Sequence, residues 1–479
     1  MKFSGHVLSI TQKIKVVAKH WIRSFLANSA ASGISRKLLR NFPPLQEAVW
    51  LGLYLFRKKM FISTTEPSVV NGNYDQITAS SEKRQLLIDI SGIVLRDVHT
   101  GVQRVARSLL QELLNNPPSG FVVEPVYADA SGNMRYAWTY ACTMLNEDAH
   151  ESEDAVIAAY QGDIFYCPDL YFPYPFSTLS ALKRQGVHIT FTVYDLIPLK
   201  YPKLFSKALC LSFSDWLSGV MAVADDVVCD SLAVTNEVGE WLNDHPDLRS
   251  RALPIGFFHL GADIEASKPT FGIVNEGADI LAACQNRPTM LMVGTVEPRK
   301  GHAQVLAAVD LLWKDGVDIN LIIVGKEGWR TQDLTRQLRR HSERYRRLFW
   351  LESASDGLLL QLYASASALI AASFAEGFGL PLIEAARQSL PIIARDIPVF
   401  REVASEHAFY FQGETPEELA KAIRRWLVLY KEGNAPSPTG LPWLTWAQSA
   451  RQLQGLMLGN NQWHTVWMPH GEEAESRKQ

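Results

Sequence analysis

The sequence lacks the features that mark disulfide-rich, zinc-binding and membrane-spanning proteins. Only five cysteines occur in 479 residues, and no two of them form a Cys-x-x-Cys pair. A disulfide framework and a structural zinc site are therefore not expected, and a reducing compartment is favoured. A bilayer-spanning helix needs about 18 or more apolar residues in succession, and no such run is present.

Common phosphate- and metal-binding signatures are missing as well. No Asp-x-Asp is available to hold a divalent cation against a diphosphate, and the twelve histidines form no short-spaced ligand set. The chain has no Gly-x-x-x-x-Gly-Lys-Ser/Thr loop, and no Gly-x-Gly-x-x-Gly follows the first strand of either predicted domain. Nucleotide hydrolysis and nicotinamide chemistry are therefore disfavoured, and neither a cofactor nor a metal ion is expected.

The charge is distributed unevenly along the chain. The net charge is −3, but residues 1–60 contain eleven lysines and arginines and a single acid, Glu47, so this segment is +10 and the remainder −13. Aromatic residues such as Trp21, Phe25 and Trp50 are interleaved with these charges. A basic amphipathic arm on an anionic membrane surface would explain both features. A solvated helical extension is the alternative.

Length and hydrophobic pattern predict an α/β protein with tandem domains. With 47% apolar and 20% charged residues, a chain of this length is expected to fold into two or three globular domains. Short apolar runs alternate with helical patterns, which is typical of βα units around a mostly parallel sheet. The predicted units are an extension and linker (1–85), two Rossmann-like doubly wound domains (86–264 and 285–435) and a C-terminal helix (440–460). Ligands are expected in the cleft between the carboxyl ends of the two sheets.

The first candidate site is the turn formed by residues 294–302. Val293 ends a predicted strand, and the next helix is predicted to begin near His302. Arg299 and Lys300 are therefore expected at the carboxyl edge of the sheet, beside a helix N-terminus whose free amides favour an anion. Two cations and free N–H groups suit a diphosphate. A solvated basic turn remains the alternative.

The second candidate site is the turn formed by residues 373–385. Gly377 and Gly379 allow the backbone to approach a ligand closely. Glu376 is predicted on the loop and Glu384 about one turn into the following helix. Because a carboxylate accepts two hydrogen bonds from neighbouring hydroxyls, this pair suits hydroxyl-rich ligands such as a hexose and a ribose. A strand–turn–helix with incidental acids is the alternative.

These two turns resemble the donor-binding half of family 4 retaining glycosyltransferases, which have the GT-B fold. The Glu376-x-x-x-x-x-x-x-Glu384 spacing matches the paired-glutamate motif of that family. The run from Gly294 to Gly301 is similar to the phosphate turn of bacterial mannosyl- and rhamnosyltransferases of O-antigen and capsule assembly. In the first domain, Thr100-Gly101-Val102-Gln103-Arg104 resembles the acceptor-side glycine loop, Val193-Tyr194-Asp195-Leu196-Ile197-Pro198 the His-Asp-Leu-Ile-Pro segment, and Gly261-Ala262-Asp263 the interdomain Gly-Val-Asp.

The resemblance implies a role for each matching residue. Arg299 and Lys300 would hold the donor diphosphate, Glu376 the hydroxyls of the transferred sugar, and Glu384 the ribose hydroxyls. The sequence departs from many relatives in having Thr295 in place of an arginine and Tyr194 in place of a histidine. Further residues implied at the site are Gly294, Thr295, Gly377, Phe378, Gly379 and Leu380 on the donor side, and Gly101, Tyr194 and Asp195 on the acceptor side.

The resemblance also implies a reaction. A hexose, with mannose from GDP-mannose preferred, would pass with retention of configuration to a hydroxyl of a glycan or lipid-linked acceptor in lipopolysaccharide synthesis. The leaving phosphate would take the acceptor proton, so neither a protein base nor a metal is implied. A cytoplasmic enzyme is expected, with the basic arm on the inner face of the cell membrane and no nucleic-acid partner. The alternatives are transfer from a UDP- or dTDP-sugar, rhamnosyl transfer included, nucleotide-sugar epimerisation, and a non-catalytic peripheral membrane protein.

Overall fold

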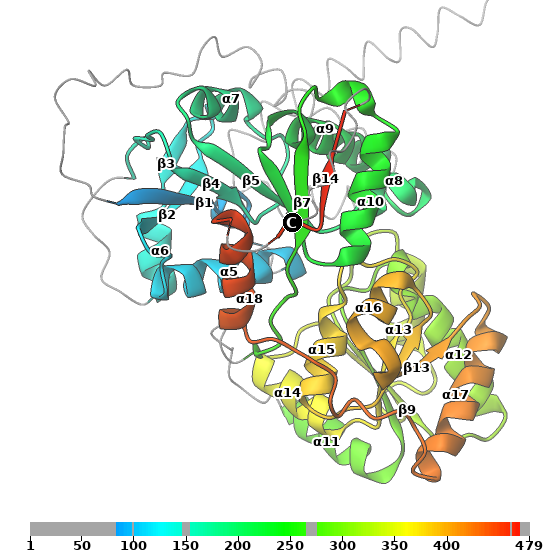
Figure 1. Ribbon diagram of the computed structural model, residues 1–479. Helices are drawn as coiled ribbons and strands as arrows, with labels where there is room; N and C mark the ends of the chain where they lie inside the picture. Colours follow the sequence, from blue (N-terminus) through cyan, green and yellow to red (C-terminus); the bar gives the residue numbers. More distant parts are fainter. Residues whose placement is uncertain (1–82, 98–99, 146–153, 265–274, 460–461, 470–479) are drawn as a thin grey trace, which may run out of the picture.

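The computed structural model describes residues 83–97, 100–145, 154–264, 275–459 and 462–469 (Figure 1). Within these ranges the chain forms two α/β domains, the first in blue to green and the second in green to orange. The basic segment of residues 1–60 lies outside the described residues, so the membrane arm stays a prediction. None of the helices in the described ranges is long and apolar enough to cross a bilayer.

The first domain is built on an eight-stranded sheet. Its strands are β1 (Arg84–Asp89), β2 (Phe121–Ala128), β3 (Met134–Tyr136), β4 (Ile164–Cys167), β5 (His188–Val193), β6 (Asp226–Cys229), β7 (Leu253–Phe257) and β14 (Thr465–Trp467). Their order is β14-β7-β6-β5-β4-β1-β2-β3, and only the two edge strands β14 and β3 are antiparallel to their neighbours. Its helices are α4 (Ser91–Leu95), α5 (Gly101–Asn115), α6 (Trp138–Leu145), α7 (Phe176–Arg184), α8 (Ile197–Lys200), α9 (Lys207–Val223) and α10 (Leu232–Asn243), with short turns η2 (Pro202–Leu204) and η3 (Pro246–Leu248).

The second domain contains a six-stranded, wholly parallel sheet. Its strands are β8 (Thr289–Val293), β9 (Asn320–Val324), β10 (Leu348–Leu351), β11 (Ala368–Ala371), β12 (Ile392–Arg395) and β13 (Ala408–Phe411), in the order β10-β9-β8-β11-β12-β13. Every residue of β9 and β12 is buried, as expected for strands covered by helices on both faces. The helices are α11 (Asn275–Asn286), α12 (His302–Lys314), α13 (Gln332–Arg340), α14 (Asp356–Ser365), α15 (Leu380–Arg387), α16 (Pro398–Ala404) and α17 (Pro416–Lys431), with turns η5 (Pro298–Lys300) and η6 (Ser405–His407).

The chain passes between the domains a second time near its C-terminal end. The last helix, α18 (Trp446–Met457), lies against α5 of the first domain (red beside blue in Figure 1). Asp263 accepts a hydrogen bond from the backbone N–H of Trp446 at 2.7 Å, and Gln454 donates to the carbonyl of Asn116 at 3.1 Å. The Trp446 side chain is fully buried. The two crossing segments are thus fastened to each other and to the first domain.

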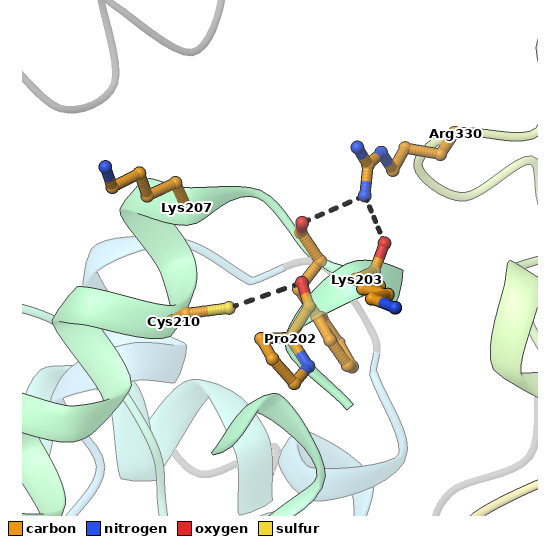
Figure 2. A pocket seen from close by; sticks show the side chains of 6 residues that line it. Pro202, Lys203, Lys207, Cys210 and Arg330 are labelled. Carbon is orange, nitrogen blue, oxygen red and sulfur yellow. Dashed lines mark hydrogen bonds between the residues drawn. The ribbon is translucent and has the colours of Figure 1, made fainter. Parts of the chain in front are cut away.

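The domains also meet at a seam beside α9. Arg330 of the second domain donates to the carbonyls of Lys203 and Phe205 at 2.5 and 3.0 Å, and the indole of Trp329 donates to Leu204 at 3.0 Å. Figure 2 shows Arg330 reaching across this seam. The seam borders a cavity of about 490 Å³ that is lined by Pro202, Lys203, Phe205, Lys207, Cys210 and Arg330.

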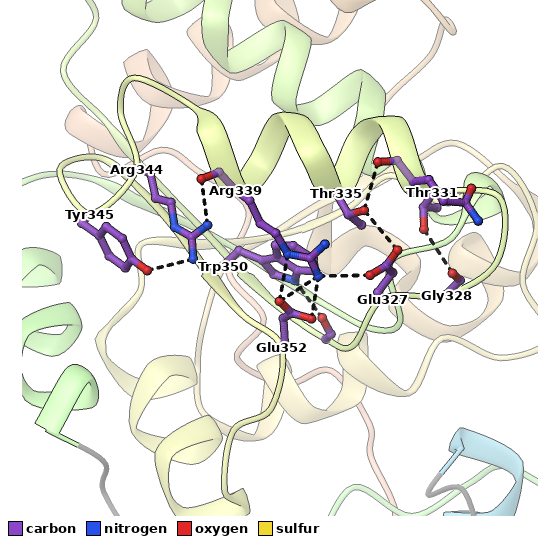
Figure 3. Close-up of polar contacts among 11 residues, drawn as sticks. Glu327, Gly328, Thr331, Thr335, Arg339, Arg344, Tyr345, Trp350 and Glu352 are labelled. Atoms are coloured by element: carbon purple, nitrogen blue, oxygen red, sulfur yellow. Dashed lines mark hydrogen bonds and ion pairs between the residues drawn. The ribbon is translucent and has the colours of Figure 1, made fainter. Parts of the chain in front are cut away.

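The structure has a strand, with bounds within two residues, for each strand that the apolar runs of the sequence predict: 86–90, 121–126, 163–166, 188–193, 227–229, 289–293, 320–324, 348–351, 368–372, 391–394 and 409–411. One predicted helix is wrong at its end. The pattern predicts a helix from Asp333 to Tyr345, whereas α13 ends at Arg340. The helix ends because the next residue, His341, is extended, with a ψ of 139°. Arg344 then turns back to donate to the carbonyl of Arg339 at 3.0 Å (Figure 3). Tyr345 has a positive φ of 62°. Strands β3, β7 and β14 are not predicted, because each is short or lacks a continuous apolar run.

Arg339 fixes α13 to the sheet beneath it. It forms ion pairs with Glu327 and Glu352, both at 3.0 Å, and its guanidinium lies 4.8 Å from the ring centre of Trp350 (Figure 3). The four polar and aromatic groups tie the loop after β9, α13 and β10 together. This cluster packs within the second domain and supports the sheet that carries the candidate site.

Candidate functional site

The two predicted turns lie side by side because β8 and β11 are parallel neighbours whose carboxyl ends share one edge of the sheet. The Phe374 amide donates to the carbonyl of Arg299 at 2.8 Å, which joins the two turns directly. Gly301 has a φ of 76°, and a Cβ there would lie 2.4 Å from the carbonyl oxygen of Ala372. A glycine is therefore required for the first turn to approach the end of β11.

Glu376 is the centre of an ion-pair cluster at this edge. It accepts hydrogen bonds from Arg299 at 2.8 Å and from the hydroxyl of Ser373 at 2.6 Å, and it pairs with Lys300. The exposed fraction of the side chain is 18% for Arg299, 15% for Lys300 and 8% for Glu376. The structure thus brings together three residues that the sequence predicts for one catalytic centre.

The cluster keeps Glu376 ionised. Burial alone would raise the pKa of Glu376, but the charges of Arg299 and Lys300 outweigh it and hold the pKa at about 2. An ionised carboxylate in this position accepts hydrogen bonds and cannot serve as a general acid near neutral pH. The two cations retain N–H groups for a further anion, because an arginine carries five donors and a lysine three.

Glu384 lies about one turn into α15, within the second candidate site, and both of its oxygens are occupied. Oε1 pairs with Arg104 of α5 at 2.7 Å, and Oε2 accepts from the hydroxyl of Tyr363 at 2.7 Å. The exposed fraction of the Glu384 side chain is only 3%. Arg104 belongs to the first domain, so this carboxylate is held from both sides of the cleft.

Gly377 lies where the two domains approach each other closely. A Cβ at Gly377 would lie 1.9 Å from the carbonyl oxygen of Tyr194 and 3.3 Å from Oδ2 of Asp230. The hydroxyl of Ser231 donates to the carbonyl of Gly377 at 2.7 Å. The loop after β11 therefore presses against the carboxyl edge of the first-domain sheet.

The other predicted residues do not all face the cleft between the domains. The hydroxyl of Tyr194 donates to Pro168 at 2.6 Å inside the first domain, so its carbonyl, and not its ring, faces the donor loop. Asp195 is half-buried, and the charge of Arg299 acts on its pKa, which burial raises. Gly101 is exposed at the first turn of α5. The remaining predicted residues occupy the donor-side turns themselves: Gly294 with a φ of 138°, Thr295 half-buried, Phe378 buried against His259, Gly379 with a φ of 96° at the N-cap of α15, and Leu380 as the first residue of α15.

The part of the chain that carries both turns is similar to a known protein family. Residues 278–438, which include both turns, match the family described as "Glycosyl transferases group 1". These residues are a group 1 glycosyltransferase domain. The serotype-specific mannosyltransferase WbdA of Escherichia coli is 42% identical over 375 residues, 77% of this chain and 44% of the relative. The O-antigen chain mannosyltransferase RfbU of Salmonella typhimurium is 26% identical over 247 residues, 52% of this chain and 62% of the relative.

Solved structures give the fold. The sucrose-phosphate synthase of Thermosynechococcus elongatus aligns with a TM-score of 0.53 at 17% identity, covering 79% of this chain and 99% of the other. Anabaena HepE in complex with UDP and glucose aligns with a TM-score of 0.51 at 15% identity, covering 78% and 99%. Both establish the GT-B architecture for the two domains. This chain spans about half the length of the WbdA relatives that it matches, between 44% and 47% of each.

Sequence reasoning missed one acidic residue of the first domain, on the side that faces the glycosyltransferase domain. Asp230 follows β6 directly and is 3% exposed, and its Oδ1 has no hydrogen-bond partner within the described part of the chain. Burial and the charge of Asp195 raise its pKa well above the usual range. Its position at the carboxyl end of a parallel strand is the signal that could have indicated it.

A buried histidine in the glycosyltransferase domain makes the stability depend on pH. Burial, with the charges of Lys300 and Arg299, lowers the pKa of His302 from 6.5 to about 3. The unfolded chain therefore binds a proton at His302 below about pH 6.5 that the folded chain does not, and stability is lost as the pH falls through this window. At pH 5 the loss attributable to His302 is on the order of 2 kcal/mol of unfolding free energy.

We expect His302→Asn to flatten this acid dependence. Denaturant unfolding of the wild type and the variant at pH 7.5 and pH 5 measures the difference. The exposed His245, replaced in the same way, serves as the control for the loss of a histidine that is not buried. An unaltered pH dependence in His302→Asn would contradict the assignment.

Proposed function

We propose that this chain is a retaining, metal-independent glycosyltransferase that moves mannose from GDP-mannose to a glycan or lipid-linked acceptor. The acceptor belongs to bacterial surface polysaccharide, and the reaction takes place in the cytoplasm. The observation that carries the proposal is the cluster of Arg299, Lys300 and Glu376 at the carboxyl edge of β8 and β11, facing the first domain. The mannosyltransferase names of the WbdA and RfbU relatives support the choice of sugar.

The cluster suits the charge changes of glycosyl transfer. As the glycosidic bond breaks, negative charge grows on the leaving diphosphate and positive charge on the anomeric carbon. Arg299 and Lys300 would compensate the first, and preplaced donors of this kind are worth roughly 10²–10³ in rate each by analogy with oxyanion holes. Glu376, ionised at neutral pH, would accept hydrogen bonds from the sugar hydroxyls. The departing phosphate would take the acceptor proton on the same face, so none of the steps calls for a metal.

The test has two stages. Thermal-shift measurements with GDP, UDP and dTDP identify the base, and stabilisation by GDP alone is expected. Transfer from labelled GDP-mannose to a mannose-terminated glycolipid is then followed with and without EDTA, and the anomeric configuration of the product is determined by NMR. Inverted product, or loss of transfer in EDTA, contradicts the mechanism. Release of free GDP with no sugar on the acceptor would favour an epimerase or hydrolase instead.

The basic segment of residues 1–60 is proposed to bring the enzyme to an anionic membrane, where a lipid-linked acceptor is located. Each lysine or arginine near such a surface contributes about 1 kcal/mol, so a segment of charge +10 should bind measurably. We expect the full chain, but not a chain lacking residues 1–60, to float with liposomes that contain anionic lipid. Neutral liposomes are the control. Equal flotation of the two proteins would contradict a membrane role for the segment.

A further inference from the structure

The ion pair between Arg104 and Glu384 joins the two domains at a residue that the proposed function needs for the donor. Arg104 stands in the first turn of α5, 280 residues earlier in the chain than Glu384, and their side chains meet at 2.7 Å. The second oxygen of Glu384 is held by Tyr363, which comes from α14 of the same domain as Glu384. Only the arginine therefore depends on how the two domains are placed.

This pair closes off the carboxylate. With both oxygens engaged and 3% of the side chain exposed, Glu384 cannot be reached by a ribose while Arg104 is in place. The arginine itself is only partly satisfied: its Nη2 is buried and has no hydrogen-bond partner among the residues that the structure describes. Burying a guanidinium nitrogen without a hydrogen bond costs free energy that no bond offsets. The ion pair between Arg104 and Glu384 is therefore suited to break when a ligand competes for the carboxylate.

We propose that Arg104 competes with the ribose of the nucleoside diphosphate for Glu384. This inference rests on the proposed function, in which Glu384 holds the ribose hydroxyls. In the structure Arg104 occupies the carboxylate that the ribose would need, so nucleoside binding requires that the arginine withdraw. Arg104 is thus a positioning residue that acts through Glu384. It couples occupancy of the donor site to the spacing of the domains, so that the donor enters before the cleft closes.

The competition has a consequence that a merely structural role would not produce: the nucleotide should bind more tightly once the Arg104 side chain is removed. Removal of an intramolecular competitor raises the fraction of molecules that are competent to bind, and the apparent Kd falls by the same factor. We expect Arg104→Ala to bind GDP about three- to tenfold more tightly than the wild type. Arg104→Lys keeps a cation in reach of Glu384, so its affinity for GDP should stay close to the weaker affinity of the wild type.

Calorimetry with GDP, UDP and dTDP tests the proposal on the full chain. Arg107→Ala is the matched control, because Arg107 lies one turn further along α5 and bonds to Tyr140 and Asp97 of its own domain. It should leave the affinity unchanged. Arg104→Gln, which keeps a hydrogen-bond donor, replaces Arg104→Ala if the latter does not fold, and is expected to bind more tightly than the wild type as well.

The outcomes separate this inference from the proposed function. If the wild type binds a nucleoside diphosphate and Glu384→Gln weakens that binding, the ribose assignment holds. In that case, an Arg104→Ala variant that binds no more tightly than the wild type overturns the competition but leaves the proposed function standing. If neither the wild type nor Arg104→Ala binds any of the three nucleotides, the proposed function fails, and the competition fails with it.

Discussion

Replacing Gly377 by alanine should abolish most of the turnover while leaving both domains folded. The new methyl group would lie 1.9 Å from the carbonyl oxygen of Tyr194, which belongs to the opposite domain. The backbone of Gly377 does not have a positive φ, so the second domain itself accommodates an alanine. The substitution therefore acts on the approach of the domains, and a displacement of about 1 Å at a reacting centre costs on the order of 10² in rate.

The measurements for this variant are turnover of the proposed donor and affinity for GDP. Turnover is expected to fall by about 10²-fold, and GDP binding, which uses the second domain, to stay within about threefold. Gly239→Ala in α10 is the control, since a Cβ there meets nothing within 4 Å. Wild-type turnover in Gly377→Ala would show that the contact with Tyr194 is not needed in the reacting state.

The architecture of the second domain was predictable because its strands are buried on both faces. Strands such as β8 and β9 read as continuous apolar runs, and the predicted bounds agree with the structure. The position of the two candidate turns followed from the same pattern, since each turn comes directly after a buried strand. That the turns are neighbours depends on the strand order, which places β8 beside β11 although β9 and β10 lie between them in sequence.

Contacts across the cleft could not be predicted from local patterns. Arg104 and Glu384 each belong to a recognisable segment, but nothing in either segment indicates that the two side chains meet. The same is true of Ser231 and Gly377. The resemblance implies one shared role for Arg299 and Lys300, which is to hold the donor diphosphate, with more of the neutralisation resting on Arg299 because Thr295 replaces an arginine. In the structure their surroundings differ, and the expected results of substituting them differ accordingly.

Lys300→Ala should lower turnover by roughly 10²–10³ with little loss of stability, by analogy with the removal of one donor from an oxyanion hole. Among the residues that the structure describes, the ammonium group of Lys300 pairs with Glu376, and its removal leaves this carboxylate bound to Arg299 and Ser373. Arg299 instead bridges Glu376 and the buried Glu297, at 2.8 and 2.9 Å. Arg299→Ala leaves both carboxylates short of a cation, and breaking a buried pair of this kind costs about 3–5 kcal/mol.

The two variants therefore separate charge at the donor from support of the fold. Isothermal calorimetry with GDP, steady-state turnover and denaturant unfolding are measured for each. Lys300→Ala is expected to weaken GDP binding and slow turnover at near wild-type stability, whereas Arg299→Ala shows both defects together with a large loss of stability. Lys314→Ala, an exposed residue at the end of α12, is the control for removing a positive charge. Wild-type GDP affinity in Lys300→Ala would contradict a role for this residue in binding the diphosphate. Its pair with Glu376 would then have a structural role only.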